Sequence, residues 1–380
     1  MNFKRKQSIE SQLYPKRTLI IYGPRRVGKT TLLTSFLKTR DPVTTFFATG
    51  DNQLVRDTFA RQYLSDITDF VHPYTLIAID EAQQIPHIGI GAKMLVDAFP
   101  EKTLILTGSS SLYLASEVGE PLTGRHFILT LLPLSQAEMQ ASRSELQHYL
   151  EQFLTYGAYP EILLAPDNET RVKLLTELTA SYLYKDALAL EGIKSPDLLQ
   201  NIAKMIALQI GHDVSLNEIA TALNTSVQTV GRYLDLLEKM FVIKRVRGFS
   251  RNLRNEITQK ARYYFLDNGI RNAVIGQFNP LSSRADVGAL WENFCFMEFL
   301  KQDTIADIPS TFYFWRTHQG QEIDIVREAN GTLHAYECKW NSHKKVRVPR
   351  TFRDAYPEID FTVLTPGNYL DIFLSGAPKS

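Results

Sequence analysis

The sequence is poor in cysteine and in long apolar runs. Only two of the 380 residues are cysteine, Cys295 and Cys338, which is too few for a disulfide framework. The longest apolar runs, such as residues 104–106 and 128–134, are far shorter than the roughly 20 residues that span a bilayer. Residues 1–6 lack the apolar core of a signal peptide. We therefore expect a cytoplasmic protein with no membrane partner.

Neither sign of charge predominates. Lysine plus arginine number 42 and aspartate plus glutamate 41, so net charge alone gives no reason to expect nucleic acid. The length and the 44% hydrophobic content allow two or three cores. No repeat or linker marks the boundaries, and the motifs described below predict domains at residues 1–140, 141–204, 205–265 and 266–380.

A phosphate-binding loop follows the first predicted strand. Residues 18–22 form an apolar, β-branched run that ends at a complete Walker A motif, and helical spacing follows it. Its glycines let backbone N–H groups surround phosphates, Lys29 reaches the β and γ phosphates, and Thr30 supplies a hydroxyl to Mg²⁺. The residues expected to bind nucleotide are Gly23, Pro24, Arg25, Arg26, Val27, Gly28, Lys29, Thr30 and Thr31.

Two further strand ends complete this predicted site. Residues 75–79 lead into Asp80 and Glu81, a Walker B pattern in which Asp80 holds Mg²⁺ and Glu81 activates water. Residues 103–106 lead into hydroxyl side chains, of which Ser109 is the first choice to sense the γ-phosphate or to position that water. Strands alternating with helices predict a parallel α/β sheet with the ligand at its carboxyl edge.

The alternative is a chance match or an inactive loop, with Asp80 and Glu81 serving only as a polar strand end. We favour a nucleotide site because the strand context, the two acids and the polar third strand end occur in the expected order. A sugar or metabolite kinase is disfavoured because no compact acceptor segment lies between the Walker elements.

These motifs, together with Thr-Gly-Arg followed by Leu-Pro-Leu-Ser, resemble AAA+-like bacterial and archaeal P-loop ATPases that carry a C-terminal domain of unknown function. The resemblance covers nearly the whole chain and implies ATP and Mg²⁺ as ligands, although ATP is not distinguished from GTP. It also implies that Arg125 faces a phosphate, in cis or across a subunit interface. The alternative is that Arg125 pairs with a surface acid. If Arg125 acts in trans, the protein is a homo-oligomer.

The middle of the chain has helical spacing. Residues 145–190 predict a helical lid or connector with a break at 157–160. A helix-turn-helix follows, with a second helix starting at Ser226, and residues 241–243 lead into a wing. On that second helix we expect Val227 among the inward-facing residues and Tyr233 among the outward-facing ones.

Basic residues cluster in and after this helix-turn-helix. Between 239 and 262 they outnumber the one acid, Glu256, by eight to one, which suits DNA phosphate contacts and a steep salt dependence. The residues expected to contact DNA are Gln228, Thr229, Arg232, Arg247, Arg251 and Arg254. Winged helices also serve as protein-docking modules, and this alternative stays open.

Acidic residues gather in the last predicted domain. Period-2 alternation puts Asp324 on one strand, and Glu337 and Lys339 on one face of the next. Beside Glu292, the acids Asp324 and Glu337 would bind Mg²⁺ or Mn²⁺, and Lys339 would activate water that attacks a phosphodiester.

This arrangement resembles the PD-(D/E)XK nuclease fold, to which the C-terminal domain of the same ATPase family is similar. The resemblance implies an active site at Glu292, Asp324, Glu337 and Lys339, although Ile323 stands where proline is usual. The alternative is an ordinary ion pair in a domain that no longer cleaves. The sequence thus predicts an ATP-hydrolysing, DNA-binding protein, or else a nucleotide-dependent switch or protein-remodelling module whose C-terminal half binds a partner.

Overall fold

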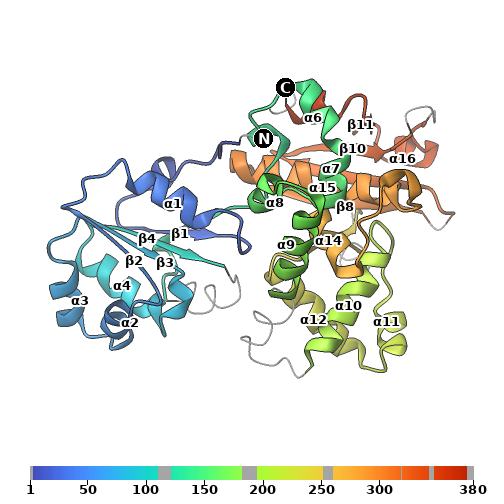
Figure 1. Cartoon of the computed structure of the whole chain (residues 1–380). Coiled ribbons are helices and arrows are strands. Elements are labelled where there is room, and N and C mark those ends of the chain that lie inside the picture. Colours follow the sequence, from blue (N-terminus) through green and yellow to red (C-terminus); the bar gives the residue numbers. More distant parts are fainter. Residues whose placement is uncertain are drawn as a thin grey trace.

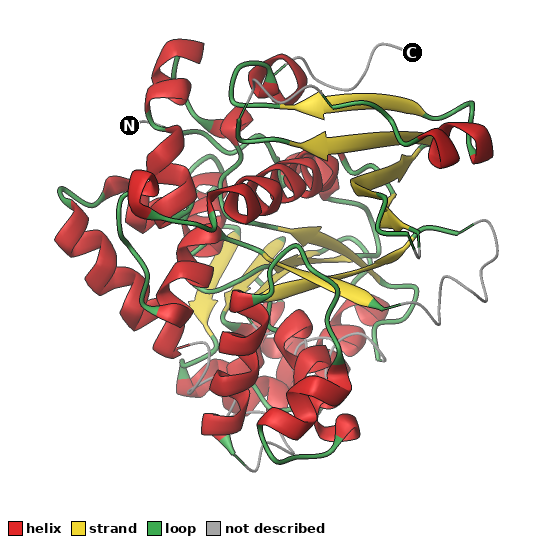
Figure 2. Cartoon of the chain, turned by 90° about the vertical axis from the view of Figure 1, so that its right-hand side faces the viewer, coloured by secondary structure: helices red, strands yellow, loops and turns green. Residues whose placement is uncertain are grey.

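The computed structural model describes residues 3–109, 121–181, 195–250, 260–317, 319–341 and 346–374. These residues form two bodies in Figure 1, with the first sheet on the left and a larger body of helices and a second sheet on the right. Figure 2 shows the larger body from its outer side, with its helical part below the strands of its sheet.

The first sheet has five parallel strands in the order β2-β3-β4-β1-β5. Its strands are β1 (Thr18–Tyr22), β2 (Thr45–Thr49), β3 (Leu76–Asp80), β4 (Thr103–Gly108) and β5 (His126–Thr130). Its described α-helices are α1 (Lys29–Leu37), α2 (Gln53–Ala60), α3 (Leu64–Val71) and α4 (Ile88–Ala98). The parallel sheet and the three strands predicted from the sequence are confirmed. Because β4 lies between β1 and β3, the hydroxyls that follow it lie between the two Walker motifs.

The middle of the chain is helical, as predicted. Its α-helices are α6 (Arg143–His148), α7 (Leu150–Tyr156), α8 (Pro160–Leu164), α9 (Asn168–Ala180), α10 (Pro196–Leu208), α11 (Leu216–Ala222), α12 (Val227–Lys239) and α14 (Asn268–Ile275). The predicted break lies between α7 and α8, where proline at the first position of α8 suits a helix start. Helix α10 continues through the boundary that we expected at residue 204, so no domain junction lies there.

The second sheet has six strands in the order β11-β10-β9-β8-β6-β7. Its strands are β6 (Ile243–Gly248), β7 (Ala261–Phe265), β8 (Ser310–Arg316), β9 (Glu322–Ala329), β10 (Thr332–Cys338) and β11 (Asp360–Leu364), and its accompanying helices are α15 (Val287–Ala306), α16 (Arg350–Ala355) and α17 (Tyr369–Phe373). Strand β6, which we expected to lead into a wing, pairs with β7 and also with β8. The sheet therefore crosses the boundary that we expected between residues 265 and 266.

The second helix of the predicted helix-turn-helix is turned relative to our expectation. Tyr233 is buried and Val227 is 41% exposed, the reverse of the prediction. The buried residues of α12 are Val230, Tyr233, Leu234 and Leu237. Positions i, i+3, i+4 and i+7 share one face of a helix, and Val227 lies in the first turn beside the Ser226 cap.

Residues 131–139, here called the junction segment, connect the two bodies. At one end the Leu131 N–H donates to the carbonyl of Tyr22, 2.6 Å away, at the end of β1. Further along, the Leu134 N–H donates to the Ala158 carbonyl at 3.0 Å, and the Leu134 carbonyl accepts from Lys301 Nζ at 3.0 Å. The segment is thus tied to β1, to the loop between α7 and α8, and to α15.

A buried carboxylate fixes the loop that leads into α8. Asp267 caps α14 by accepting from the N–H groups of Gly269 and Ile270, and it also accepts from the Ala158 N–H at 2.7 Å. A Cβ at Gly157 would lie 1.8 Å from Asp267 Oδ1, and its φ of +75° also favours glycine. Burial raises the pKa of Asp267 to about 6. One side chain therefore sets the start of both α8 and α14.

We predict that Asp267→Ala lowers the free energy of unfolding by about 3 kcal/mol, because buried backbone N–H groups lose their acceptor. Asp167→Ala is the matched control, since Asp167 also caps a helix through its side chain but is exposed. The measurement is urea unfolding of both variants. An equal loss in the two variants would contradict a special role for the buried cap.

Candidate functional site

The phosphate-binding loop joins β1 to α1. Gly23 packs against the junction segment so closely that a Cβ would lie 2.0 Å from the Leu131 carbonyl oxygen. Gly28 has φ +97° and precedes the first turn of α1. The buried Lys29 ammonium donates to the carbonyls of Gly23 and Pro24 at 2.9 and 2.8 Å. Glycines and Lys29 thus hold the curved loop in place.

The two Walker motifs meet at one hydrogen bond. Thr30 Oγ1 donates to Asp80 Oδ2 at 2.7 Å, and Thr107 at the end of β4 donates to Asp80 Oδ1. Asp80 is 4% exposed. A hydroxyl and a carboxylate side by side are hard oxygen donors of the kind that Mg²⁺ prefers, so Thr30 and Asp80 fit a magnesium ion.

Glu81 is held in an unusual backbone conformation beside them. Its φ of +51° lies in the left-handed region, which is uncommon for glutamate and is enriched at functional sites. The Glu81 N–H donates to Thr107 Oγ1 at 3.0 Å, and the side-chain amide of Gln83 donates to the Glu81 carboxylate and, at 3.2 Å, to Ser109 Oγ. Sequence reasoning chose Ser109 and overlooked Gln83, and it did not single out Thr107 among the hydroxyls after β4.

The tip of the loop contacts the helical part of the chain. Val27 is fully buried and belongs to the same hydrophobic core as Tyr159, Ile162 and Leu175 of the helical part. Next to it, the Arg26 guanidinium donates to Glu161 at 3.2 Å and to Glu177 at 2.5 Å. Two consecutive loop residues are therefore held by another part of the chain.

A cavity of about 580 Å³ lies between the loop and these helices. One wall consists of Arg26, Gly28, Lys29, Thr30, Thr31 and Glu81, and the other contains Pro160, Glu161, Leu164, Ala165, Pro166, Thr170 and Leu174. The first wall is polar and the second mainly apolar. This division suits a ligand with an anionic end and a flat, less polar end, as a nucleotide has.

Arg125 lies at the opposite edge of the sheet from this cavity. Its carbonyl accepts from the N–H of Thr18, at the start of β1, whereas the loop follows the end of β1. Five residues of strand separate these edges by roughly 16 Å. Its side chain donates to Asp97 at 2.5 Å. This placement is incompatible with a contact between Arg125 and a phosphate in the same subunit.

Part of the expected DNA-binding surface is exposed. Gln228, Arg232 and Arg247 are exposed, and Thr229 is half-buried beside the Ser226 hydroxyl. Arg251 and Arg254 lie outside the described residues.

Acids neutralise much of the local basic excess. Arg245 pairs with Asp235, and Lys244 pairs with Glu238 at 3.1 Å, and both acids precede the range that we counted in the sequence. Arg262, which we counted among the eight basic residues of this range, is 1% exposed and pairs with Asp213 and Glu322. It therefore cannot serve as a surface phosphate contact.

Of the four C-terminal residues predicted to form a site, Asp324 and Glu337 both lie within ion-pair distance of Lys339, and Glu292 is close enough to Asp324 for their charges to interact. Asp324 Oδ2 accepts from the Cys338 N–H at 2.7 Å and lies 3.8 Å from Lys339 Nζ. Lys339 also lies 2.5 Å from Glu337 Oε1. Glu292 accepts from the Tyr264 hydroxyl at 2.6 Å. We call Glu292, Asp324, Glu337 and Lys339 the carboxylate cluster.

Burial dominates the electrostatics of this cluster. It raises the pKa of Glu337 to about 7, with repulsion from Asp324 adding to the shift. Burial likewise raises the pKa of Asp324 and, together with Asp324, that of Glu292. For Lys339, burial lowers the pKa, but attraction to Asp324 and Glu337 outweighs it and the pKa rises.

The described geometry does not assign a metal ion to the cluster. Within the described ranges, no group of three or more His, Cys, Asp and Glu side chains is placed to hold one. Each of the three acids already accepts a hydrogen bond from a protein donor. The geometry resembles a compensated ion-pair cluster more than an open metal centre.

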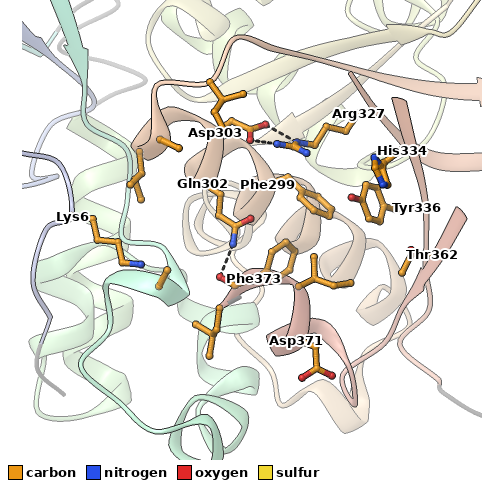
Figure 3. A pocket seen from close by; sticks show the side chains of 16 residues that line it. Lys6, Phe299, Gln302, Asp303, Arg327, His334, Tyr336, Thr362, Asp371 and Phe373 are labelled. Carbon is orange, nitrogen blue, oxygen red and sulfur yellow. Dashed lines mark hydrogen bonds and ion pairs between the residues drawn. The ribbon is translucent and has the colours of Figure 1, made fainter. Parts of the chain in front are cut away.

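A second, mostly apolar cavity of about 340 Å³ lies between the end of α15, the second sheet and α17. Figure 3 shows Phe299, Tyr336 and Phe373 around it, the Asp303–Arg327 ion pair at one side, and Lys6 approaching from the N-terminal segment. Because Arg327 and Asp303 neutralise each other, neither residue presents an unpaired charge to a ligand in this cavity.

Among the described helices, none is long and apolar enough to cross a membrane.

Glu337→Gln tests the cluster. A carboxyl group whose pKa is raised on folding binds more protons in the folded state, so its contribution to stability falls as pH rises from its ordinary 4.5 to about 7. We predict that wild type loses stability relative to Glu337→Gln over that range, measured by urea midpoints at pH 5 and 7.5. A constant difference between the two proteins would show that Glu337 is not buried as described.

The sequence families match the chain in three parts. Residues 15–140 match an AAA domain, residues 147–281 match a domain of unknown function (DUF8612), and residues 287–370 match another domain of unknown function (DUF4143). The cavity beside the phosphate-binding loop lies between the first two regions, and the carboxylate cluster lies in the third.

Three similar proteins are known only as uncharacterized proteins. One from Mycobacterium tuberculosis is 28% identical over 365 residues, covering 94% of this chain and 78% of that protein. One from Haemophilus influenzae is 26% identical over 373 residues, covering 90% and 88%. One from Methanocaldococcus jannaschii is 23% identical over 358 residues, covering 84% and 74%.

Two solved structures are also similar over much of the chain. A chain of Drosophila ORC bound to DNA is 14% identical, with 72% of this chain and 92% of that chain covered and a TM-score of 0.22. A Vibrio cholerae protein is 11% identical, with 94% and 96% covered and a TM-score of 0.16. The motifs and family matches together show that the chain carries a P-loop AAA domain, which indicates a nucleotide-binding ATPase, and a C-terminal DUF4143 domain.

Proposed function

We propose that this chain is a magnesium-dependent ATP hydrolase that uses the nucleotide state of its loop to move or hold its C-terminal two thirds. The observation that carries this proposal is the complete burial of Val27, a residue of the phosphate-binding loop, in the core of the helical part. A loop that changes shape on binding a triphosphate cannot leave that core unchanged, because protein interiors are close-packed.

The triphosphate binds with its anionic end against the loop. Backbone N–H groups before α1 and the positive end of that helix stabilise the phosphates, and the Lys29 ammonium transfers from its two carbonyl acceptors to phosphate oxygens. The base lies toward the apolar wall that contains Leu164 and Leu174. This pose uses both walls of the cavity.

Hydrolysis uses Glu81 as the general base. Thr30 and Asp80 would hold Mg²⁺, which neutralises charge that develops on the phosphates. Glu81 is oriented through its backbone by Thr107 and through its carboxylate by Gln83, which also reaches Ser109. We therefore assign proton abstraction from water to Glu81, and positioning to Thr107, Gln83 and Ser109.

Arg125 can contact a phosphate during hydrolysis only if the protein forms a homo-oligomer. Its side chain is 40% exposed and lies at the edge of the sheet remote from its own nucleotide cavity. We propose a homo-oligomer in which Arg125 exchanges Asp97 for a phosphate in a neighbouring copy. The competing interpretation is a surface ion pair of little energetic consequence.

A nucleic-acid partner is the second candidate function. The observation in its favour is that Gln228 and Arg232 on α12 and Arg247 on β6 are exposed side chains on neighbouring elements of the helix-turn-helix region. Arginine side chains of this kind contact DNA phosphates. The neutralised Lys244 and Arg245 make the expected surface smaller than the sequence suggested.

We assign no cleavage step to the carboxylate cluster. Arg262 joins Asp213 after α10 to Glu322 on β9, and Lys339 joins the acids of β9 and β10. These contacts support the alternative in which a nuclease-like domain holds its neighbours or binds a partner without cutting. Asp324-dependent cleavage of DNA in the presence of Mg²⁺ or Mn²⁺ would overturn this assignment.

Glu81→Gln tests the hydrolase. We predict that ATP turnover falls by a factor of about 10² to 10⁴, because the general base is lost, while the ATP dissociation constant stays within about twofold. Glu101→Gln, an exposed acid in the same domain, is the control and should keep wild-type turnover. Turnover is measured by phosphate release and binding by calorimetry. Unchanged turnover in Glu81→Gln would refute the assigned base.

The combined variant Arg232→Ala with Arg247→Ala tests nucleic-acid binding. Each lost phosphate contact should lower the slope of log affinity against log salt by about one unit. Lys173→Ala, which removes one exposed cation on α9, is the control and should leave the slope unchanged. Fluorescence anisotropy with duplex DNA at several salt concentrations measures this. Equal slopes in all three proteins would show that Arg232 and Arg247 do not contact DNA phosphates, and the interpretation as a nucleotide-dependent switch would then stand without DNA binding.

A further inference from the structure

The N-terminal strap, residues 3–7, contacts the phosphate-binding loop from outside the matched AAA region. It runs along the junction segment, where Phe3 pairs with Met139 and the Lys4 N–H donates to the Glu138 carbonyl at 2.9 Å. The AAA match begins only at residue 15. The strap is therefore an addition to the nucleotide-binding domain as the family defines it.

Arg5 is the residue of the strap that reaches the loop. Its Nη2 donates to the Val27 carbonyl at 2.6 Å, and its Nη1 donates to Glu138 Oε2 at 3.1 Å. The Arg5 side chain is 12% exposed and that of Glu138 is 1% exposed. Burial lowers the pKa of Arg5, although Glu138 partly offsets this. Burying an arginine costs free energy unless its N–H groups are hydrogen-bonded. The bonds to Val27 and Glu138 therefore offset the cost of burying Arg5.

The bond to Val27 determines the direction of a loop amide. A peptide bond is planar and trans, so the carbonyl of residue 27 and the N–H of residue 28 point in opposite directions. When Arg5 holds the Val27 carbonyl on one side, the Gly28 N–H faces the other. Gly28 lines the nucleotide cavity, and its φ of +97° is one that few other residues would adopt.

We propose that Arg5 is a positioning residue for the nucleotide site, which orients the Gly28 N–H toward the phosphates by holding the Val27 carbonyl. The proposal rests on the proposed function, since it concerns the same loop and the same ligand. Arg5 does not touch the nucleotide. It acts through one peptide group, and Glu138 holds its guanidinium in place from the junction segment.

Glu138 anchors the strap to the junction segment. Its carboxylate also accepts from the N–H groups of Lys6 at 3.2 Å and Ser135 at 3.0 Å, so it joins the strap to the junction segment at several points. The junction segment in turn is bonded to α15 through Gln136, whose N–H donates to Glu298 at 2.8 Å. Arg5 therefore holds the loop against a segment that is itself hydrogen-bonded to α15 of the larger body.

The test compares Arg5→Met with Arg5→Lys. Methionine keeps an unbranched apolar stem without donors, and lysine keeps the charge with a single donor centre. We expect Arg5→Met to raise the dissociation constant for Mg-ATP about tenfold, and Arg5→Lys to raise it less, because a charge-assisted bond to the loop is lost or only partly replaced. Turnover at saturating ATP should change much less than KM, since Glu81 and its partners are untouched.

Lys4→Met is the matched control, because Lys4 lies on the same strap with an exposed side chain. It should bind ATP as wild type does. The melting temperature without nucleotide is recorded for every variant. If Arg5→Met lowers the melting temperature but leaves the dissociation constant and KM unchanged, Arg5 is only a structural anchor and the proposal is overturned. If wild type itself binds no ATP, the proposed function fails instead, which is a separate outcome.

Discussion

The burial of Val27 is the contact on which the rest of this structure depends. A phosphate-binding loop needs an exposed concave side, but nothing requires its convex side to be covered. Here the convex side is covered: the Val27 side chain enters a helical core, and its carbonyl accepts from Arg5. Burying a valine contributes about 1.5–3 kcal/mol, and a charge-assisted hydrogen bond about as much. Moving the loop tip therefore requires the neighbouring elements to move with it.

This constraint explains why the nucleotide cavity has walls from two family regions. The AAA region supplies the phosphate side and Glu81, and the segment that contains helices α8 and α9 supplies the mainly apolar side. The start of α8 is set by Asp267, which also caps α14, and α14 packs against α7, α9 and α10. A conformational change of the phosphate-binding loop would therefore displace helices that pack against one another as far as the second sheet.

The second sheet is stabilised by a different kind of contact. Arg262 is buried on β7 and lies between Asp213, Glu322 and, at 3.8 Å, Glu292. Its guanidinium also lies over the Phe314 ring. Removing one partner of such a buried cluster leaves an uncompensated charge, which is strongly destabilising. Glu292, one of the acids that resemble a nuclease site, therefore also takes part in the ion-pair cluster that joins the helical part to the sheet.

Sequence patterns were sufficient for the nucleotide-binding core. The apolar runs at residues 18–22, 75–79 and 103–106 predicted three parallel strands correctly, because period and turn chemistry are local. Helical spacing and the proline at residue 160 placed the break before α8. These features depend on residues close together in the chain.

What the sequence could not predict depends on long-range contacts. Pairing of β6 with β8 removes the boundary expected at residue 265, and acids outside the counted range neutralise Lys244 and Arg245. Arg5 precedes every motif, and its partner Val27 is 22 residues away. Gln83 does lie two residues from Glu81, and an amide so close to a catalytic acid was a usable signal.

Hydrogen exchange of backbone amides with and without Mg-ATP tests the central claim most directly. If the loop tip transmits nucleotide state through Val27 and Arg5, ATP should change protection in α8, in α9 and in the junction segment as well as in the loop, and Lys29→Ala should abolish all of these changes. If ATP alters exchange only within residues 18–109 while it binds normally, the loop is not coupled to the helical part, and the account is contradicted.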